Sequence, residues 1–250
     1  MSQAFRLVAW NIRAGGGVRV DAIADALLDW RGDAIVLSEF RATQASSTLA
    51  QALSAQGYPF QIDTTHQVKH GGNALLIAAR EPIRKVGLRR YPTEPGRWCA
   101  VRLQKTRLVI CGLHVPNQHT GRKPKFHDEV LALMQRWRGG PAIIAGDTNS
   151  GRIGEDEETS IFNQRTTSWF DEIHNAGWAD AFRLKYGMRR EFTWYSPGHD
   201  NGFRLDQAFV SPRLTDCVAD CQHIWAGGRD DTRRDRVSDH AAVIVDICLP

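Results

Sequence analysis

The sequence predicts an α/β protein in which β-sheets pack against each other and helices cover the outside. Short apolar runs typical of strands recur through all 250 residues. Many of these runs are too uniformly apolar to have one face in water, so both faces must be covered. Their order is mixed: an early strand–helix–strand precedes consecutive strands and then another helix and strand. That order differs from the alternation expected of a doubly wound parallel sheet.

The individual elements follow from hydrophobic spacing. Strands are expected, in chain order, at residues 5–10, 34–37, 74–78, 99–103, 108–113, 142–145, 207–210 and 241–247. Helices are expected at residues 21–30, 41–55, 126–137 and 168–176, where apolar residues recur on one face. We see no linker-like stretch, low-complexity segment or repeat. The sequence therefore predicts a single domain over residues 1–250.

Composition restricts the function only weakly. The net charge of +4 and the pI of about 8.9 fit an acidic partner such as nucleic acid, but many proteins without such a partner share these values. No apolar run approaches the roughly 20 residues of a membrane helix, and no secretory signal precedes the first strand. Cys99, Cys111 and Cys248 lie in apolar runs, which indicates buried free thiols. Such thiols favour a reducing cytoplasm. We expect no membrane association and no obligate protein partner.

Polar side chains gather where the apolar runs end. Asn11, Glu39, His114 and Asp147 come directly after such runs or close behind them, and Asn149 lies two residues beyond Asp147. Each of these residues taken alone is more simply a turn or cap residue. Their repeated position at strand exits is harder to explain in that way.

A second group of polar residues reverses this arrangement. Asp206 and the pair Asp239-His240 directly precede apolar runs. In a sheet with antiparallel members, the exit of one strand and the entrance of its neighbour share an edge, so both groups can converge on one rim. Because gathered carboxylates repel one another unless a cation compensates them, a hard divalent ion is the natural occupant.

These motifs, taken in order, resemble those of the endonuclease/exonuclease/phosphatase superfamily, and within it the exonuclease III-like branch of abasic-site endonucleases. The supporting segments include Trp10-Asn11-Ile12-Arg13, Leu37-Ser38-Glu39, Gly146-Asp147-Thr148-Asn149, Arg204-Leu205-Asp206 and Ser238-Asp239-His240. The resemblance implies a DNase I-like fold, which is a four-layer α/β sandwich of two packed mixed β-sheets flanked by helices.

The resemblance also implies a metal site and a catalytic set. Glu39 would be the principal Mg²⁺ ligand, with Asn11 and Asp239 completing the site; Mn²⁺ is an alternative ion. Asp147 would orient and deprotonate the attacking water, and Asn149 would fix its position.

Further residues would act on the phosphate. Asp206 would hold His240 protonated, so that its imidazole can hydrogen-bond the phosphate. His114 could contact the phosphate or protonate the leaving group, and Asn117 would donate another hydrogen bond. The predicted substrate-binding set is Asn117, Trp194, Phe203 and Arg204. For the aromatic members, a core-packing role is the open alternative.

One departure from the family pattern affects the substrate. The abasic-site branch usually has tyrosine where this chain has His114, whereas DNase I-like and sphingomyelinase-like members have histidine. The leading hypothesis is a Mg²⁺-dependent nuclease that cleaves DNA phosphodiesters at abasic sites or 3′ ends. The alternatives are hydrolysis of a small or lipid-like phosphoester, and a non-catalytic binding domain. No proposed catalytic position carries an inert residue, which argues against the last of these.

Overall fold

Two mixed β-sheets packed face to face form the centre of the molecule. The structure is a computed structural model and describes residues 3–88, 91–198, 200–227 and 236–249. Within these residues, the first sheet has six strands in the order β13(Val218–Ile224), β14(Ala242–Leu249), β1(Gln3–Asn11), β2(Ala34–Phe40), β4(Ala74–Ala79), β3(Phe60–Asp63). The second sheet has six strands in the order β5(Ile83–Lys85), β6(Trp98–Leu103), β7(Val109–His114), β8(Ala142–Asp147), β12(Asp206–Val210), β9(Ala179–Asp180).

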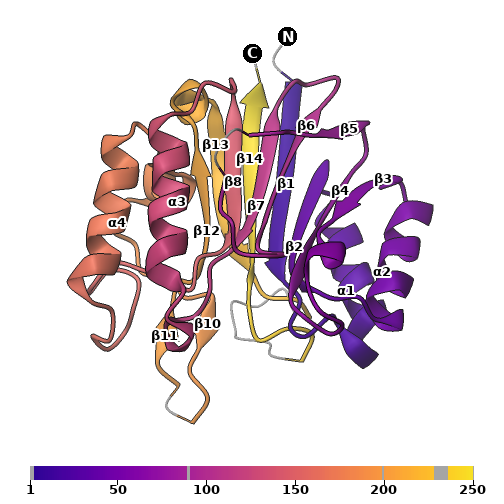
Figure 1. Cartoon of the computed structure of the whole chain (residues 1–250), viewed down its shortest axis with the longest axis horizontal. Coiled ribbons are helices and arrows are strands. Elements are labelled where there is room, and N and C mark those ends of the chain that lie inside the picture. Colours follow the sequence, from indigo (N-terminus) through magenta and orange to yellow (C-terminus); the bar gives the residue numbers. More distant parts are fainter. Residues whose placement is uncertain (1–2, 89–90, 199, 228–235, 250) are drawn as a thin grey trace.

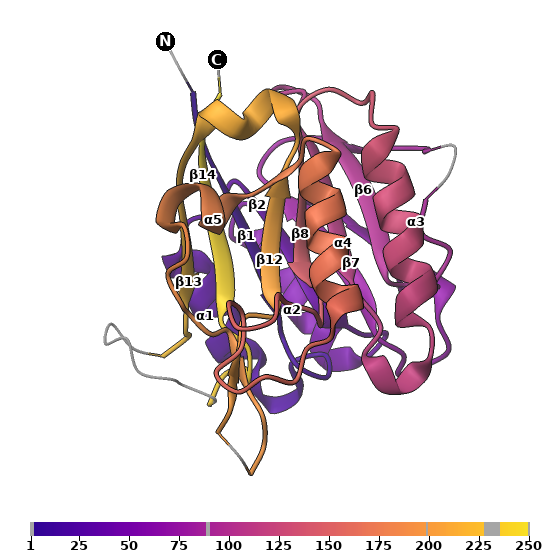
Figure 2. The same cartoon turned by 90° about the vertical axis from the view of Figure 1, so that its left-hand side faces the viewer.

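Helices cover the two outer faces. In Figure 1, α1(Val20–Asp29) and α2(Gln44–Ala55) lie on the side of the first sheet, and α3(Lys123–Gln135) and α4(Gln164–Asn175) lie on the opposite side. Figure 2 shows α3 and α4 side by side in front of the second sheet. The prediction of a four-layer α/β sandwich is confirmed.

The central strands contribute side chains to two hydrophobic cores, one on each face of the sheet, which explains their uniformly apolar sequences. In β2, Val36 packs into the core between the sheets, whereas Ile35 and Leu37 pack beneath α1 and α2. In β8, Ile143 lies between the sheets and Ile144 lies beneath α3 and α4. Successive side chains of a strand point to opposite faces, so a strand covered on both faces needs apolar residues at every position.

Two glycines allow close approaches near the ends of β7 and β8. A Cβ on Gly112 would lie 2.8 Å from Cγ1 of Val36 in the facing sheet. Gly146 has φ +144°, and a Cβ there would lie 2.1 Å from the carbonyl oxygen of Leu113 on the neighbouring strand. Only a residue without a side chain fits such positions. Gly146 thereby lets β8 continue beside β7 as far as Asp147.

The structure contains elements that hydrophobic spacing missed. They are short or polar: β3, β5, β9, β13, α5(Ala181–Tyr186) and the pair β10(Trp194–Tyr195) and β11(Gly202–Phe203). The expectation of three buried thiols is wrong in part. Cys99 and Cys111 are buried, but Cys248 is exposed because it lies on the outward side near the end of β14. Among the described residues, no helix is long and apolar enough to cross a membrane.

Candidate active site

Strand pairing assembles the polar cluster at one end of the sandwich. On β8, Asp147 pairs with His114 of parallel β7 on one side and with Asp206 of antiparallel β12 on the other. In the facing sheet, β1 ends at Asn11 on the same rim. Strand exits and entrances therefore meet, as the sequence pattern predicted. Figure 1 shows the β10–β11 hairpin projecting from this end of the molecule.

Asp147 lies at the centre of the cluster and joins the two sheets. Its Oδ1 accepts a 2.8 Å hydrogen bond from the main-chain nitrogen of Asn149. Its Oδ2 accepts bonds from Nδ2 of Asn11 at 3.0 Å and from Nδ2 of Asn149 at 3.3 Å. Because Asn11 belongs to the first sheet and Asp147 to the second, the carboxylate is oriented by both sheets.

The electrostatic environment of Asp147 suits a proton acceptor. The side chain is 2% exposed. Burial raises the pKa of Asp147 to about 7; nearby His240 acts against this rise, and Asp206 adds to it. A base with a pKa near the working pH combines a useful deprotonated fraction with a useful affinity for the proton.

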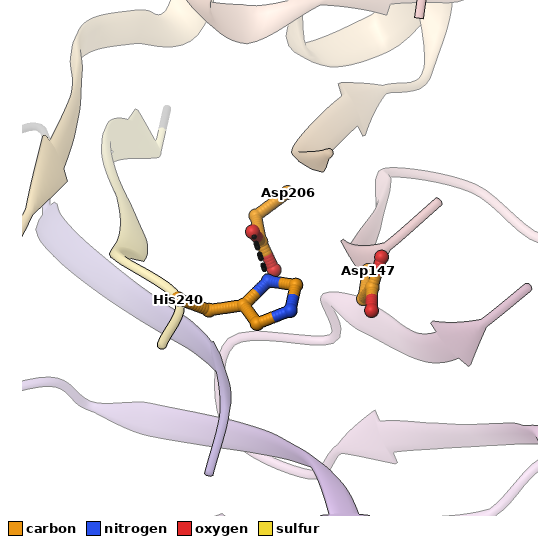
Figure 3. Close-up of side chains that lie close together, drawn as sticks. All are labelled: Asp147, Asp206 and His240. Atoms are coloured by element: carbon orange, nitrogen blue, oxygen red, sulfur yellow. Dashed lines mark hydrogen bonds and ion pairs between the residues drawn. The ribbon is translucent and has the colours of Figure 1, made fainter. Parts of the chain in front are cut away.

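Asp206 and His240 form a buried ion pair beside Asp147. Nδ1 of His240 lies 2.8 Å from Oδ2 of Asp206. Figure 3 shows the imidazole ring between this carboxylate and Asp147. Burial lowers the pKa of His240, but Asp206 and Asp147 outweigh it and raise the pKa to about 10. The ring is therefore cationic at neutral pH and can donate a hydrogen bond from its second nitrogen.

The stability that this ion pair contributes should depend on pH. The folded-state pKa of His240, about 10, exceeds the ordinary 6.5. The contribution is therefore fully present below pH 6.5 and is lost as the pH rises through 10. Denaturant unfolding of the wild type and His240→Gln should show a stability difference that shrinks steadily between these pH values. A difference that stays constant over this range would contradict the assignment.

His114 lies on the other side of Asp147 and is neutral. Its Nε2 is 3.6 Å from Oδ2 of Asp147. Burial, together with the charges of Arg97 and His240, holds the pKa of His114 well below its ordinary value. Its buried Nδ1 has no hydrogen-bond partner among the described residues. The cluster thus pairs a neutral imidazole with a cationic one; the resemblance implied the charge of His240 but not the neutral state of His114.

The predicted metal ligands gather around residues 11–14. Oδ1 of Asn11 accepts from the main-chain nitrogen of Arg13, and Oε2 of Glu39 accepts from that of Ala14 at 2.7 Å. Oδ2 of Asp239 is 3.9 Å from Nε of Arg13. Glu39 has φ +58° at a register shift between β2 and β4. Such an irregularity re-aims a side chain at a cost in backbone strain.

These residues fit a hard divalent cation. All three offer oxygen atoms, which Mg²⁺ prefers. Oδ1 of Asp239 is buried and has no hydrogen-bond partner among the described residues, so it is available as a ligand atom. Asp147, Asp206 and His240 also lie close enough to hold a metal, with ligand atoms within 4.8 Å of one another. Nδ1 of His240 is already paired with Asp206, whereas the residues near Arg13 offer oxygen atoms alone, which makes them the better match to a hard cation.

Arg97 lies beside this cluster and was not identified from the sequence. Its Nη1 donates a 3.4 Å hydrogen bond to the carbonyl of His114. Burial lowers the pKa of Arg97, and Asp147 and Glu39 are among the carboxylates that raise it. Arg97 directly precedes β6, which is antiparallel to β7. The rule that located Asp206, a polar residue at a strand entrance, would therefore also have located Arg97.

The aromatic residues of the predicted substrate-binding set lie next to His240. Trp194 pairs with His240 in a β-bridge, and their ring centroids are 6.4 Å apart. The ring of Phe203 lies 5.8 Å from that of Trp194. Phe203 is only 6% exposed, whereas Trp194 is partly exposed. Asn117 is exposed near the end of β7, and its side chain makes no capping hydrogen bond.

Arg204 occupies a different place from the one expected. The side chain is 1% exposed; Nε donates to Asp156 at 2.8 Å and Nη2 donates to Asp180 at 2.6 Å. The guanidinium thus lies within a buried ion-pair network, away from the solvent-facing rim. Because its charge is used inside the protein, we leave Arg204 out of the proposed substrate-binding set.

Replacing Arg204 should affect stability rather than chemistry. Arg204→Met would leave the buried carboxylate of Asp156 with Arg183 as its remaining partner and would remove the ion pair of the partly buried Asp180. Breaking a buried pair in this way costs about 3–5 kcal/mol of unfolding free energy. Denaturant unfolding measures the loss, and kcat per folded molecule should stay within a factor of two. A large fall in kcat with unchanged stability would return Arg204 to the binding site.

Comparisons with known proteins identify the family and the fold. The profile of the Endonuclease/Exonuclease/phosphatase family matches residues 8–240. The 3′ phosphatase NExo from Neisseria, solved with a product DNA hairpin, has a TM-score of 0.80 and 20% identity, covering 97% of this chain and 99% of that one. An AP endonuclease from Archaeoglobus fulgidus has a TM-score of 0.78 and 16% identity, covering 96% and 98%. AP endonuclease LMAP from Leishmania major has a TM-score of 0.77 and 19% identity, covering 99% and 89%. A search of curated proteins gave no match.

Proposed function

The chain belongs to the endonuclease/exonuclease/phosphatase family, and on this premise we propose that it is a Mg²⁺-dependent phosphoesterase that cleaves DNA at abasic sites or 3′ ends. The observation that carries the proposal is the arrangement around Asp147: one buried carboxylate with a raised pKa lies between a neutral and a cationic imidazole. The structural neighbours described above include a 3′ phosphatase and two AP endonucleases, which supports the choice of DNA.

The proposed residues divide the reaction between them. Asp147 takes a proton from water, whose oxygen then bonds to phosphorus while the bond to the leaving oxygen breaks. Asn149 and Asn11 hold the carboxylate in place through the hydrogen bonds given above. The second nitrogen of cationic His240 donates to a phosphoryl oxygen, and Asp206 keeps that ring charged. Among the remaining predicted residues, His114 and Asn117 would add donors to the phosphate, and Trp194 and Phe203 would line the sugar.

Mg²⁺, or Mn²⁺ in its place, would be held by Asn11, Glu39 and Asp239. When bound, it would supply polarisation of the phosphoryl oxygen and compensation of charge on the leaving oxygen. All three residues offer oxygen ligands and contact residue 13 or 14. Oδ1 of Asp239, which has no hydrogen-bond partner within the described part of the chain, supports this assignment.

A substrate panel tests the proposal. The protein is incubated with abasic duplex DNA, duplex DNA carrying a 3′ phosphate, undamaged duplex DNA and small phosphodiesters and phosphomonoesters, each with Mg²⁺, Mn²⁺ or chelator. We expect metal-dependent cleavage of abasic or 3′-blocked DNA. Turnover of a small ester without cleavage of any DNA would reject the nuclease and favour the second candidate, a small-phosphoester hydrolase. The histidine at position 114, found in DNase I-like and sphingomyelinase-like members, keeps this candidate open.

A further inference from the structure

We propose that Lys123 is a positioning residue: from the first turn of α3, its ammonium holds the main-chain carbonyl of Asn149 and thereby fixes the loop that directly follows Asp147, the last residue of β8. The inference rests on the proposed function, in which Asp147 is the base and this loop holds its carboxylate through Asn149. Lys123 is the first residue of α3 and is only 8% exposed. Its Nζ donates a hydrogen bond to the carbonyl oxygen of Asn149.

Asn149 turns the chain through a left-handed backbone conformation, which asparagine adopts more readily than most residues. It has φ +46°, which is uncommon for a residue with a side chain. Its main-chain nitrogen donates to Asp147, and its Nδ2 donates to the carbonyl of Val115 at 2.8 Å. Lys123 binds the carbonyl, which these two bonds leave free. Together the three contacts fix the peptide on both sides of Asn149, and with it the direction of the Asp147 carboxylate.

A second side chain of α3 binds the next residue of the loop. Nε2 of His127, one turn after Lys123, lies 3.1 Å from Oγ of Ser150. The His127 ring stacks on Trp169 with centroids 4.0 Å apart and an interplanar angle of 8°. Nε1 of Trp169 donates to the carbonyl of His127 at 3.0 Å. Burial lowers the pKa of His127 to about 3, so the ring stays neutral. Helix α3 therefore contacts two consecutive loop residues.

Stability alone does not explain a lysine at position 123. Burying an ammonium costs free energy, and the start of a helix repels a cation. Among the described residues, no carboxylate lies within ion-pair distance of Lys123. Burial lowers the pKa of Lys123 to about 8, and the negative charge of Asp147 acts in the opposite direction. An apolar residue at position 123 would avoid both costs at the start of α3. We therefore attribute the buried charge of Lys123 to its contact with the loop.

The test compares three variants in the full-length protein. Lys123→Met removes the ammonium but keeps an unbranched stem, and Lys123→Arg restores a cationic donor. Lys125→Met is the matched control, because Lys125 lies two residues further along α3, is 74% exposed and pairs with Glu129 at 3.7 Å. Hydrogen exchange of the amides of residues 148–151 reports on the loop without substrate. Steady-state kcat and KM on the DNA cleaved by the wild type report on chemistry, and thermal unfolding reports on the fold.

For Lys123→Met we expect faster amide exchange at residues 148–151, a kcat lowered by roughly 10²-fold, as for an ångström-scale misplacement, and a KM within a factor of two. Lys123→Arg should recover part of the kcat and part of the slow amide exchange. Lys125→Met should resemble the wild type in both measurements. Unchanged loop exchange in Lys123→Met, or a fall in kcat explained entirely by a smaller folded fraction, would overturn the proposal. If the wild type cleaved no substrate, the proposed function would fail, while hydrogen exchange would still decide the role of Lys123.

Discussion

Replacing Asp147 by asparagine is expected to lower kcat by about 10²–10⁴-fold, the usual contribution of a positioned general base. Asparagine keeps the shape of the side chain but cannot accept the proton of the attacking water. KM should change little, because the phosphate is bound by other groups. Single-turnover cleavage of the DNA substrate, measured with the wild type and Asp147→Asn at the same metal concentration, gives the ratio directly.

The fold should tolerate this change, which makes the kinetic loss interpretable. Burial raises the pKa of Asp147 to about 7, so an uncharged side chain at this position is already close in free energy to the charged one. Asparagine can still accept the hydrogen bond from Asn11, but its amide nitrogen then loses the bond from the main-chain nitrogen of Asn149. Removal of a buried functional charge offsets this loss, so we expect the free energy of unfolding to change little. Undiminished kcat in a folded variant would exclude Asp147 as the base.

Removing divalent metal is expected to abolish turnover, and replacing Glu39 is expected to weaken metal activation. Glu39→Gln keeps the side-chain length and one oxygen but loses the charge. Even residues that only support metal ligands typically change metal affinity by roughly 10–100-fold, and a direct ligand should matter at least as much. Titration of Mg²⁺ into chelator-treated protein, followed by initial rates, gives the half-saturating concentration for the wild type and the variant.

A matched control separates charge at the metal from charge in general. Glu94 is a partly exposed acid that pairs with Arg122 instead of lying among residues 11–14. Glu94→Gln should therefore keep the wild-type dependence on Mg²⁺. Equal Mg²⁺ requirements for the wild type and Glu39→Gln would place the metal elsewhere, and the triad of Asp147, Asp206 and His240 would then be the next candidate.

The sequence predicted the convergence of the polar residues because strand direction is encoded in simple patterns. Asp147 follows an apolar run and Asp206 precedes one, and antiparallel pairing places them opposite each other in β8 and β12. The same logic extends to His114. The length of an apolar run and the polar residue at its end are local properties, so they can be read without knowing the tertiary structure.

Other features depend on contacts between segments far apart in the sequence. Arg204 is adjacent to Leu205 and Asp206 in a motif, yet its partners Asp156 and Asp180 lie 48 and 24 residues away. The left-handed conformation of Glu39 arises at the irregular pairing of β2 with β4. The neutral state of His114 follows from its burial and from the nearby charges of Arg97 and His240. Local sequence contains none of this information.

The hydrogen bond between Asn11 and Asp147 has a mechanical consequence. It spans the interface between two stacked layers, so catalytic alignment requires that these layers do not slide past each other. Val36 and Gly112 meet at that interface. A larger side chain at either position would push the two sheets apart. Apolar substitutions between the sheets that touch no polar atom should therefore change the reaction rate. Weaker packing between the sheets should lower activity under conditions in which the helices are still folded.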